Sequence, residues 1–308
     1  MREITDITTF VAERPTVITI GTFDGVHLGH QKIIGKVVEA AREKGLLATV
    51  FTFFPHPRKV VQHDQKLKLI NTLEEKKQLL QSLGIDLLVV QSFNEAFANL
   101  SAEDFVTTLL VQRLKAKKVI IGYDHRFGKG RTADIHTMRL FGKKYGFEVE
   151  EISVQEIDEV SLSSTKIRES LNQGYVTTAA HYLGVPYMLK GTVVHGLKLG
   201  RTIGYPTANI AIAEDYKLVP KDGVYAVYSF IGGQKVYGMM SIGQNPTIEG
   251  KGASIEVYFF DFNGDLYGKE LTLHFVKYLR EEQKFASVAL LKKQLENDET
   301  AARKAITL

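Results

Sequence analysis

The pattern of apolar residues changes near residue 183, and this change constrains the fold more than any single motif. Before it, short apolar runs predict strands over 16–21, 47–53, 86–90, 117–122 and 147–153. Segments of helical periodicity lie between them, over 30–43, 73–83, 102–114 and 134–145, and Ser101 with Asp104 is an approximate capping box for the third. Strands that alternate with helices form βαβ units with parallel strands. The first half is therefore predicted to be an α/β domain with a parallel sheet.

After Leu183–Pro186 the apolar segments follow one another without helices between them. They are separated by glycine-bearing turns, and FNGD (262–265) is interpreted as an Asn-Gly hairpin turn. This pattern indicates an antiparallel barrel or sandwich. A terminal helix is expected to follow, with Val288, Leu291 and Leu295 on one face. The predicted domains are residues 1–184 and 185–308.

Composition narrows the class of protein. The chain has 308 residues, enough for two domains, and no cysteine, so disulfides and thiolate chemistry are excluded. The opening MREITDITTF carries acidic residues where a signal peptide would be basic, and no apolar run reaches membrane length, so we expect a cytoplasmic protein without membrane contact. The net charge of +4 is scattered, which fits a small anionic ligand and gives no support to nucleic acid. Homo-oligomer formation is left open.

The segment GTFDGVHLGH (21–30) directly follows the first predicted strand. Its glycines at 21, 25 and 29 do not match the dinucleotide fingerprint G-x-G-x-x-G. A Walker A motif also fails, because five residues separate Gly122 from Gly128 and Lys129 precedes a glycine. The element that remains is H-x-G-H, His27 to His30, at the turn from a strand to a helix.

This turn has the chemistry of a phosphate site. Gly29 allows a phosphate to approach the backbone, the helix start presents unpaired N–H groups, and two imidazoles can donate hydrogen bonds. Such an arrangement suits nucleotidylyl transfer, in which a nucleophile attacks the α-phosphate of ATP. The alternative is that His27 and His30 are ordinary surface or core residues.

Two further segments could bind ATP. In SSTKIRESL (163–171), hydroxyls at a helix start are followed by Lys166 and Arg168, which predicts a cradle for the β- and γ-phosphates. In 191–209, glycines at 191, 196, 200 and 204 precede Pro206–Asn209, which predicts a flap that closes over ATP. Thr207 can ligate Mg²⁺, and Asn209 can support metal or phosphate. A plain barrel turn is the alternative reading of this second segment.

Together, these motifs resemble a known family. GTFDGVHLGHQ (21–31), FTFFPHP (51–57), GYDHRFGKGR (122–131) and LSSTKIRESL (162–171) look like the adenylyltransferase module of bacterial bifunctional riboflavin kinase/FAD synthetases. The second half resembles the flavokinase module in 191–210, DGVYAV (222–227), IGQNPTI (242–248), IEVYFFDF (255–262), DLYG (265–268) and FVKYLREEQKF (275–285). The resemblance implies a Rossmann-like nucleotidyltransferase domain followed by a β-barrel. It also implies that Mg²⁺-ATP phosphorylates riboflavin to FMN, and that ATP then adenylylates FMN to FAD with release of pyrophosphate.

The same resemblance implies roles for individual residues. In the adenylyltransferase module, the ATP-contacting residues would be Gly21, Phe23, Asp24, His27, Gly29, His30, His56, Ser164, Thr165 and Arg168. Asp124 and Phe127 would contact the flavin. For Asp24, stabilisation of a turn is an equally weighted alternative to nucleotide binding. In the kinase module, Gly200, Thr207 and Asn209 would bind ATP and Mg²⁺, Glu256 would be the general base, and Arg280 would contact the flavin.

Some alternatives to these roles remain open. Glu256 could be an exposed strand residue, and Arg280 could belong to a solvated charge run. His125 and Ala133 depart from the family's usual phenylalanine and glycine, which leaves the local flavin contacts undefined. Two other functions are weighed: a different H-x-G-H adenylyltransferase with an appended barrel, and a non-catalytic nucleotide-sensing or RNA-binding protein.

Overall fold

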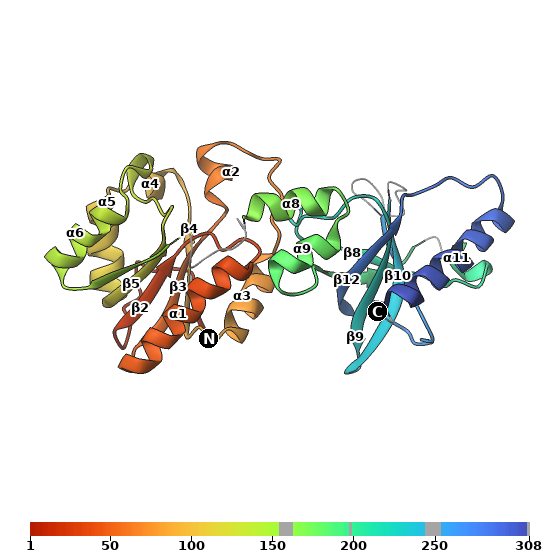
Figure 1. The fold of residues 1–308 in the computed structure, drawn as a ribbon, viewed down its shortest axis with the longest axis horizontal. Coiled ribbons are helices and arrows are strands. Elements are labelled where there is room, and N and C mark those ends of the chain that lie inside the picture. Colours follow the sequence, from red (N-terminus) through yellow and green to blue (C-terminus); the bar gives the residue numbers. More distant parts are fainter. Residues whose placement is uncertain (154–162, 197–198, 244–253, 307–308) are drawn as a thin grey trace. The chain divides into compact units, whose positions relative to one another are not determined.

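The computed structural model describes residues 1–153, 163–196, 199–243 and 254–306. These residues form two compact units, Met1–Ser163 and Ser164–Leu308, and each is described by itself (Figure 1). No helix among the described residues has the length and apolar character needed to cross a membrane.

The first unit is built on a six-stranded parallel sheet with the order β1-β4-β3-β2-β5-β6. The predicted α/β fold is confirmed. The strands are β1 (Arg2–Ile4), β2 (Thr16–Ile20), β3 (Leu47–Phe54), β4 (Leu87–Ser92), β5 (Ala116–Gly122) and β6 (Glu148–Ile152). Only β1 was not expected, because three residues at a sheet edge are too few to show a periodic pattern.

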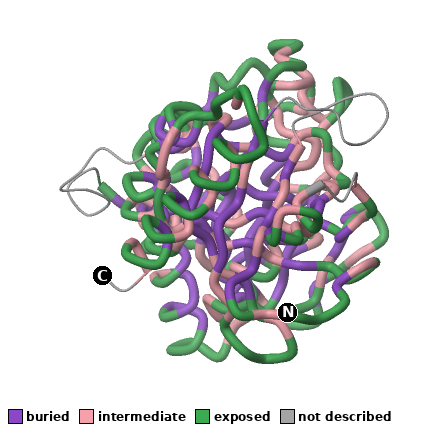
Figure 2. The backbone as a smooth tube through the Cα atoms, turned by 90° about the vertical axis from the view of Figure 1, so that its right-hand side faces the viewer, coloured by how far each residue is buried: buried purple, intermediate pink, exposed green. Residues whose placement is uncertain are grey.

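Helices cover both faces of this sheet (Figure 1). On one face, α1 (Leu28–Lys44) and α3 (Leu73–Ser82) pack over Val17 and Val50. On the other, η1 (Phe105–Arg113) and α6 (Ile135–Tyr145) pack over Ile18 and Val119. All five residues of β2 are buried, and Figure 2 shows the buried segments mostly inside and the exposed segments mostly at the outside. Alternate residues of one strand thus belong to two different cores, which is why these strands are almost continuously apolar.

Shorter helices complete the first unit. They are α2 (Pro57–Val61), α4 (Glu95–Ala98), α5 (Ala102–Asp104) and the 3₁₀ turn η2 (Lys129–Arg131). The predicted cap before α5 is confirmed, because Ser101 Oγ accepts a hydrogen bond from the Asp104 backbone N–H at 3.0 Å. The chain then continues into η1, which has π-helical rather than α-helical hydrogen bonding.

The second unit is a closed six-stranded barrel, and the predicted barrel with a terminal helix is confirmed. Its antiparallel strands have the order β10-β11-β8-β7-β12-β9. They are β7 (Met188–Val194), β8 (Ala208–Ala211), β9 (Gly223–Ile231), β10 (Gln234–Gly243), β11 (Ser254–Phe259) and β12 (Glu270–Arg280). The helices are α8 (Ser164–Asn172), α9 (Val176–Leu183), α10 (Leu199–Thr202) and α11 (Val288–Ile306).

Two expectations for this unit are wrong. FNGD is not a hairpin turn, because β11 pairs with β10 and β8 whereas β12 pairs with β7 and β9. Residues 260–269 therefore connect two strands that are not neighbours. Val288 does not face the core either, since it is 63% exposed in the first turn of α11. That helix contacts the barrel through later residues, Leu295, Ala302, Ala305 and Ile306.

Candidate active sites

The H-x-G-H motif lies in the turn from β2 to α1, and His27 is the residue that precedes the helix. The turn is buried and has an unusual backbone. Phe23 and Val26 have φ angles of 46° and 43°, in a region that residues other than glycine rarely adopt. Strain of this kind persists only where the surroundings enforce it, and it clusters at functional sites. The turn also follows the carboxyl end of a central strand, where ligands bind in open α/β sheets.

The two histidines lie against each other. Their rings are stacked with centroids 3.7 Å apart, and the Phe23 ring meets His30 edge-on at 5.1 Å. Burial, followed by the charges of His27 and Lys76, holds the pKa of His30 well below its usual value, so this imidazole is neutral. Among the described residues, His30 Nδ1 has no hydrogen-bond partner although it is buried. A buried polar atom of this kind is available to a ligand.

Asp24 is held inside the same turn. Its carboxylate is 1% exposed, and Oδ1 accepts hydrogen bonds from the backbone N–H groups of Ile70 and Asn71 at 3.0 and 3.4 Å. These bonds support the interpretation that Asp24 stabilises the turn. Its contact with the nucleotide stays a prediction.

The neighbouring strands bring further predicted residues to the same edge of the sheet. β3 and β5 flank β2, so His56 and Asp124 follow strands that end beside the H-x-G-H turn. His56 is the N-cap of α2, and its Nδ1 accepts a hydrogen bond from Arg58 N at 3.2 Å. Asp124 is exposed, whereas Phe127 is buried and forms an antiparallel bridge with Ala133.

His125, which replaces the usual phenylalanine, is mostly buried beside Phe127. The two rings are parallel within 20° at a centroid distance of 6.0 Å. Burial, and then the charge of Arg131, lowers the pKa of His125 to about 4. Its Nε2 has no hydrogen-bond partner among the described residues. His125 is therefore a neutral polar ring beside the ring of Phe127.

The second predicted phosphate cradle belongs to the other unit. Ser164, Thr165 and Arg168 lie in the first turns of α8, a helix that buries Ile167 and Leu171. Because this helix is part of the second unit, its cooperation with the H-x-G-H turn stays a prediction.

Four of the predicted kinase residues come together on the barrel: Gly200, Thr207, Asn209 and Glu256. Glu256 in β11 is directly opposite Asn209 in β8, and Thr207 Oγ1 donates a hydrogen bond to Glu256 Oε2 at 2.9 Å. Glu256 is partly buried, so it is more than an exposed strand residue. The chain packs closely here: a Cβ on Gly196 would lie 2.3 Å from the Asn209 amide nitrogen, and one on Gly200 would lie 2.2 Å from a carbonyl oxygen. The IGQNPTI motif lies mostly outside the described residues.

Arg280 is held by an ion pair rather than belonging to a solvated charge run. Its guanidinium donates to both carboxylate oxygens of Asp298 in α11, from Nε at 2.8 Å and Nη2 at 2.6 Å. Asp298 is 3% exposed and also accepts a hydrogen bond from Gln294. The pair fastens α11 to the end of β12. The flavin contact of Arg280 stays a prediction.

Sequence reasoning missed Lys76 in α3. This lysine is 5% exposed, and its Nζ donates a hydrogen bond to the Thr22 carbonyl oxygen at 2.7 Å, inside the H-x-G-H turn. The available signal was its position four residues before the buried Leu80, which places both on the same face of the helix.

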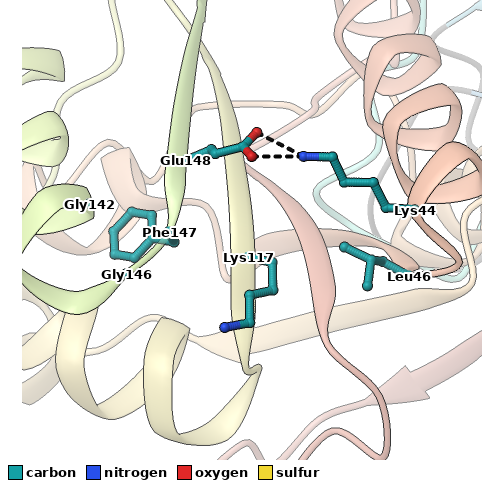
Figure 3. Close-up of a pocket in the computed structure, with 7 residues that line it drawn as sticks. All are labelled: Lys44, Leu46, Lys117, Gly142, Gly146, Phe147 and Glu148. Carbon is teal, nitrogen blue, oxygen red and sulfur yellow. Dashed lines mark hydrogen bonds and ion pairs between the residues drawn. The ribbon is translucent and has the colours of Figure 1, made fainter.

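A surface depression in the first unit lies away from these residues (Figure 3). It is lined by Lys44, Leu46, Lys117, Gly142, Gly146, Phe147 and Glu148, and the Lys44–Glu148 ion pair crosses it at 2.8 Å. These residues surround the amino ends of β3, β5 and β6. Because ligands of open α/β sheets bind at the carboxyl ends, this depression is not part of the candidate site.

The two sites define a class of protein: an enzyme with a nucleotidyltransferase-type turn on a parallel sheet and a hydroxyl–carboxylate site on a closed barrel. Family models agree with both halves, FAD synthetase matching residues 10–166 and riboflavin kinase matching residues 183–306. The chain belongs to the bifunctional riboflavin kinase/FMN adenylyltransferase family. The family and enzyme class predicted from the motifs are therefore confirmed.

Two relatives with this name match nearly the whole chain. The bifunctional riboflavin kinase/FMN adenylyltransferase of Listeria monocytogenes is 42% identical, with 93% of this chain and 91% of the relative covered. The Bacillus subtilis enzyme of the same name is 41% identical with the same coverage. A crystal structure titled as a macrolide-efflux protein from Streptococcus pneumoniae has a TM-score of 0.89 at 34% identity, with 98% of each chain covered.

Proposed function

We propose that the chain phosphorylates riboflavin to FMN in its barrel and adenylylates FMN to FAD in its α/β unit, with ATP as the donor in both steps. The observation that carries the adenylylation step is the partly buried, neutral His30 stacked on His27 at the start of α1. Incubation with riboflavin and labelled ATP tests the proposal, since only this function yields labelled FMN followed by FAD and pyrophosphate. A different H-x-G-H adenylyltransferase would give neither flavin product.

In the adenylylation step, the FMN phosphate attacks the α-phosphate of ATP and pyrophosphate leaves. The nucleophile is already ionised, so the protein has no proton to remove, and catalysis depends on positioning and charge stabilisation. The backbone N–H groups at the start of α1 and the N–H groups of His27 and His30 are donors for the phosphoryl oxygens. The surroundings that enforce the unusual backbone at Phe23 and Val26 also position these donors before ATP arrives.

In the kinase step, the flavin 5′-hydroxyl attacks the γ-phosphate and Glu256 accepts its proton. The hydrogen bond from Thr207 orients this carboxylate. Thr207 and Asn209 present hydroxyl and amide oxygens beside Glu256, a set of hard donors that fits Mg²⁺. When bound, the ion would neutralise charge on the phosphates, and Thr207 and Asn209 would hold it.

The functional domains proposed are residues 1–184 and 185–308. This division assigns α8 and α9 to the adenylyltransferase, whereas in the structure they pack with the barrel. We further propose a cytoplasmic enzyme whose partners are small molecules and not nucleic acid, which the absence of cysteine and the scattered charge support.

A further inference from the structure

Lys76 is a buried cation beside the candidate adenylylation site. Within the described part of the chain, the Thr22 carbonyl oxygen, 2.7 Å away, is the one hydrogen-bond acceptor of its ammonium group. Burial lowers the pKa of Lys76, and the nearby Asp24 carboxylate opposes that shift. A lysine is almost never this buried unless a specific interaction compensates for the lost hydration.

The segment that carries Lys76 is anchored at several points. Thr72 and Glu75 form a full capping box at the start of α3: Thr72 Oγ1 accepts from Glu75 N at 3.1 Å, and Glu75 Oε2 accepts from Thr72 N at 2.9 Å. Just before it, the Ile70 backbone N–H donates to Asp24. The strained turn is therefore fastened to residues 70–76 at two places, once through Asp24 and once through Lys76.

Lys76 also acts on the electrostatics of His30. His30 contacts the stacked ring of His27 and the ring of Phe23. The charges that act on it are those of His27 and Lys76, and the charge of Asp24 acts on Lys76. The charge of Lys76 adds to burial in lowering the pKa of His30. Lys76 therefore has two effects. It holds the backbone of the H-x-G-H turn through Thr22, and it favours the neutral form of the His30 imidazole.

We propose that Lys76 is a positioning residue for adenylyl transfer, which fixes the Thr22 carbonyl and the strained turn and supplies a buried positive charge beside His30. This role rests on the proposed binding of ATP phosphates at the H-x-G-H turn. Lys76 itself need not contact the nucleotide, because its effect passes through Thr22 and His30.

The test uses the full-length enzyme with Lys76→Met, Lys76→Arg and the matched control Lys77→Met. Methionine keeps the length and removes the charge, whereas arginine keeps the charge. Lys77 is the next residue of α3 and is ion-paired at the surface with Glu3 at 2.7 Å. FAD formation from FMN and ATP is measured together with riboflavin phosphorylation, and the His30 imidazole is titrated by NMR.

For Lys76→Met we expect kcat/KM for ATP in FAD formation to fall by at least about tenfold, which corresponds to about 1.4 kcal/mol of transition-state stabilisation. The His30 titration midpoint should move to higher pH. Lys76→Arg should keep the low midpoint and retain more activity than Lys76→Met. Lys77→Met should match the parent in every measurement, and riboflavin phosphorylation should be unchanged in all three variants.

Two results would overturn the role of Lys76. One is parental FAD formation and a parental His30 midpoint in Lys76→Met. The other is equal loss of activity in both Lys76 variants with an unmoved midpoint, which indicates that the residue acts only on stability. His30→Ala in the same assay distinguishes a failure of the Lys76 proposal from a failure of the proposed phosphate site. If His30→Ala also keeps full FAD synthesis, the phosphate site at the turn is itself wrong.

Discussion

Both candidate sites are proposed to bind ATP, but their backbones are built in opposite ways. The adenylylation site is an irregular turn with left-handed φ angles at Phe23 and Val26 and with buried polar groups. The kinase site lies mainly on regular structure, where the register of β8 and β11 places Asn209 opposite Glu256. A substitution at the barrel site should therefore change the chemistry while the backbone keeps its shape. A substitution in the turn changes the backbone and the chemistry together.

The largest effect is expected from Glu256→Gln, which tests the barrel side of this comparison. Glutamine keeps the size and one acceptor oxygen but cannot take a proton at neutral pH. Loss of a general base costs roughly a hundred- to ten-thousandfold in rate, so kcat for riboflavin phosphorylation should fall by that order while KM for ATP changes little. Steady-state kinetics measure both.

FMN supplied from outside is the control for this variant, because its conversion to FAD takes place in the other unit. A Glu256→Gln enzyme that phosphorylates riboflavin at the parental rate would refute the base assignment. Loss of FAD synthesis as well would indicate misfolding or coupled units.

His30→Ala tests the turn side. Removing a donor that stabilises transition-state charge costs on the order of a hundredfold or more, so FAD formation should fall by that factor. Riboflavin phosphorylation should stay near the parental rate, since the barrel is proposed to have an ATP site of its own. Unchanged FAD synthesis would contradict the phosphate-binding role of His30.

The contrast between the sites also explains what the sequence could predict. Strands β2 to β6 and the barrel strands other than β8 follow from apolar patterning, which is local and periodic. The four residues of β8 begin in a segment that was interpreted as a turn. The H-x-G-H turn could be located because it follows an apolar strand. The bond from Lys76 to Thr22 joins residues 54 positions apart, and no local pattern records it. The FNGD segment misled for the same reason, because the barrel's closure and not the turn sequence decides which strands pair.

The ion pair between Arg280 and Asp298 shows the same limit. The run KYLREE suggests solvated charge, and only the docking of α11 on the barrel reveals a buried partner for Arg280. The family could be recognised from its motifs even so, because the chemistry requires particular residues at particular spacings. Contacts between distant elements had to be observed.

A smaller effect is expected when the barrel unit is expressed with its boundary at residue 185 or at residue 164, because the two fragments should differ in stability. Residues 185–308 contain every barrel strand, so this fragment should fold and phosphorylate riboflavin by itself. Residues 164–308 also contain α8 and α9, which bury Ile167, Leu171, Val176 and Ala179 and connect to the barrel through the bond from Lys221 N to Leu171 O at 3.0 Å. The longer fragment should be more stable by at least about 2 kcal/mol, since each buried aliphatic side chain contributes about that much.

Urea unfolding followed by circular dichroism measures this difference. Equal stability would show that the two helices are not needed by the barrel. A shorter fragment that folds without kinase activity would show that the kinase site needs residues before 185.

The smallest effect concerns the way each unit holds buried ionisable groups. The barrel pairs Arg280 with Asp298, whereas the α/β unit buries His125 with its pKa lowered to about 4. In the unfolded chain this histidine has a pKa near 6.5, so between these values the unfolded state binds more protons and stability falls as the pH falls. Lowering the pH from 7 to 5 should lower the free energy of unfolding by about 2 kcal/mol through His125 alone.

His125→Phe, which restores an apolar ring, should remove that share of the loss of stability. Urea midpoints of the parent and the variant at both pH values test this, with His136→Phe as a control at an exposed position in α6. If the parent and His125→Phe lose the same stability on acidification, His125 is protonated in the folded protein, and the difference drawn here between the units does not hold.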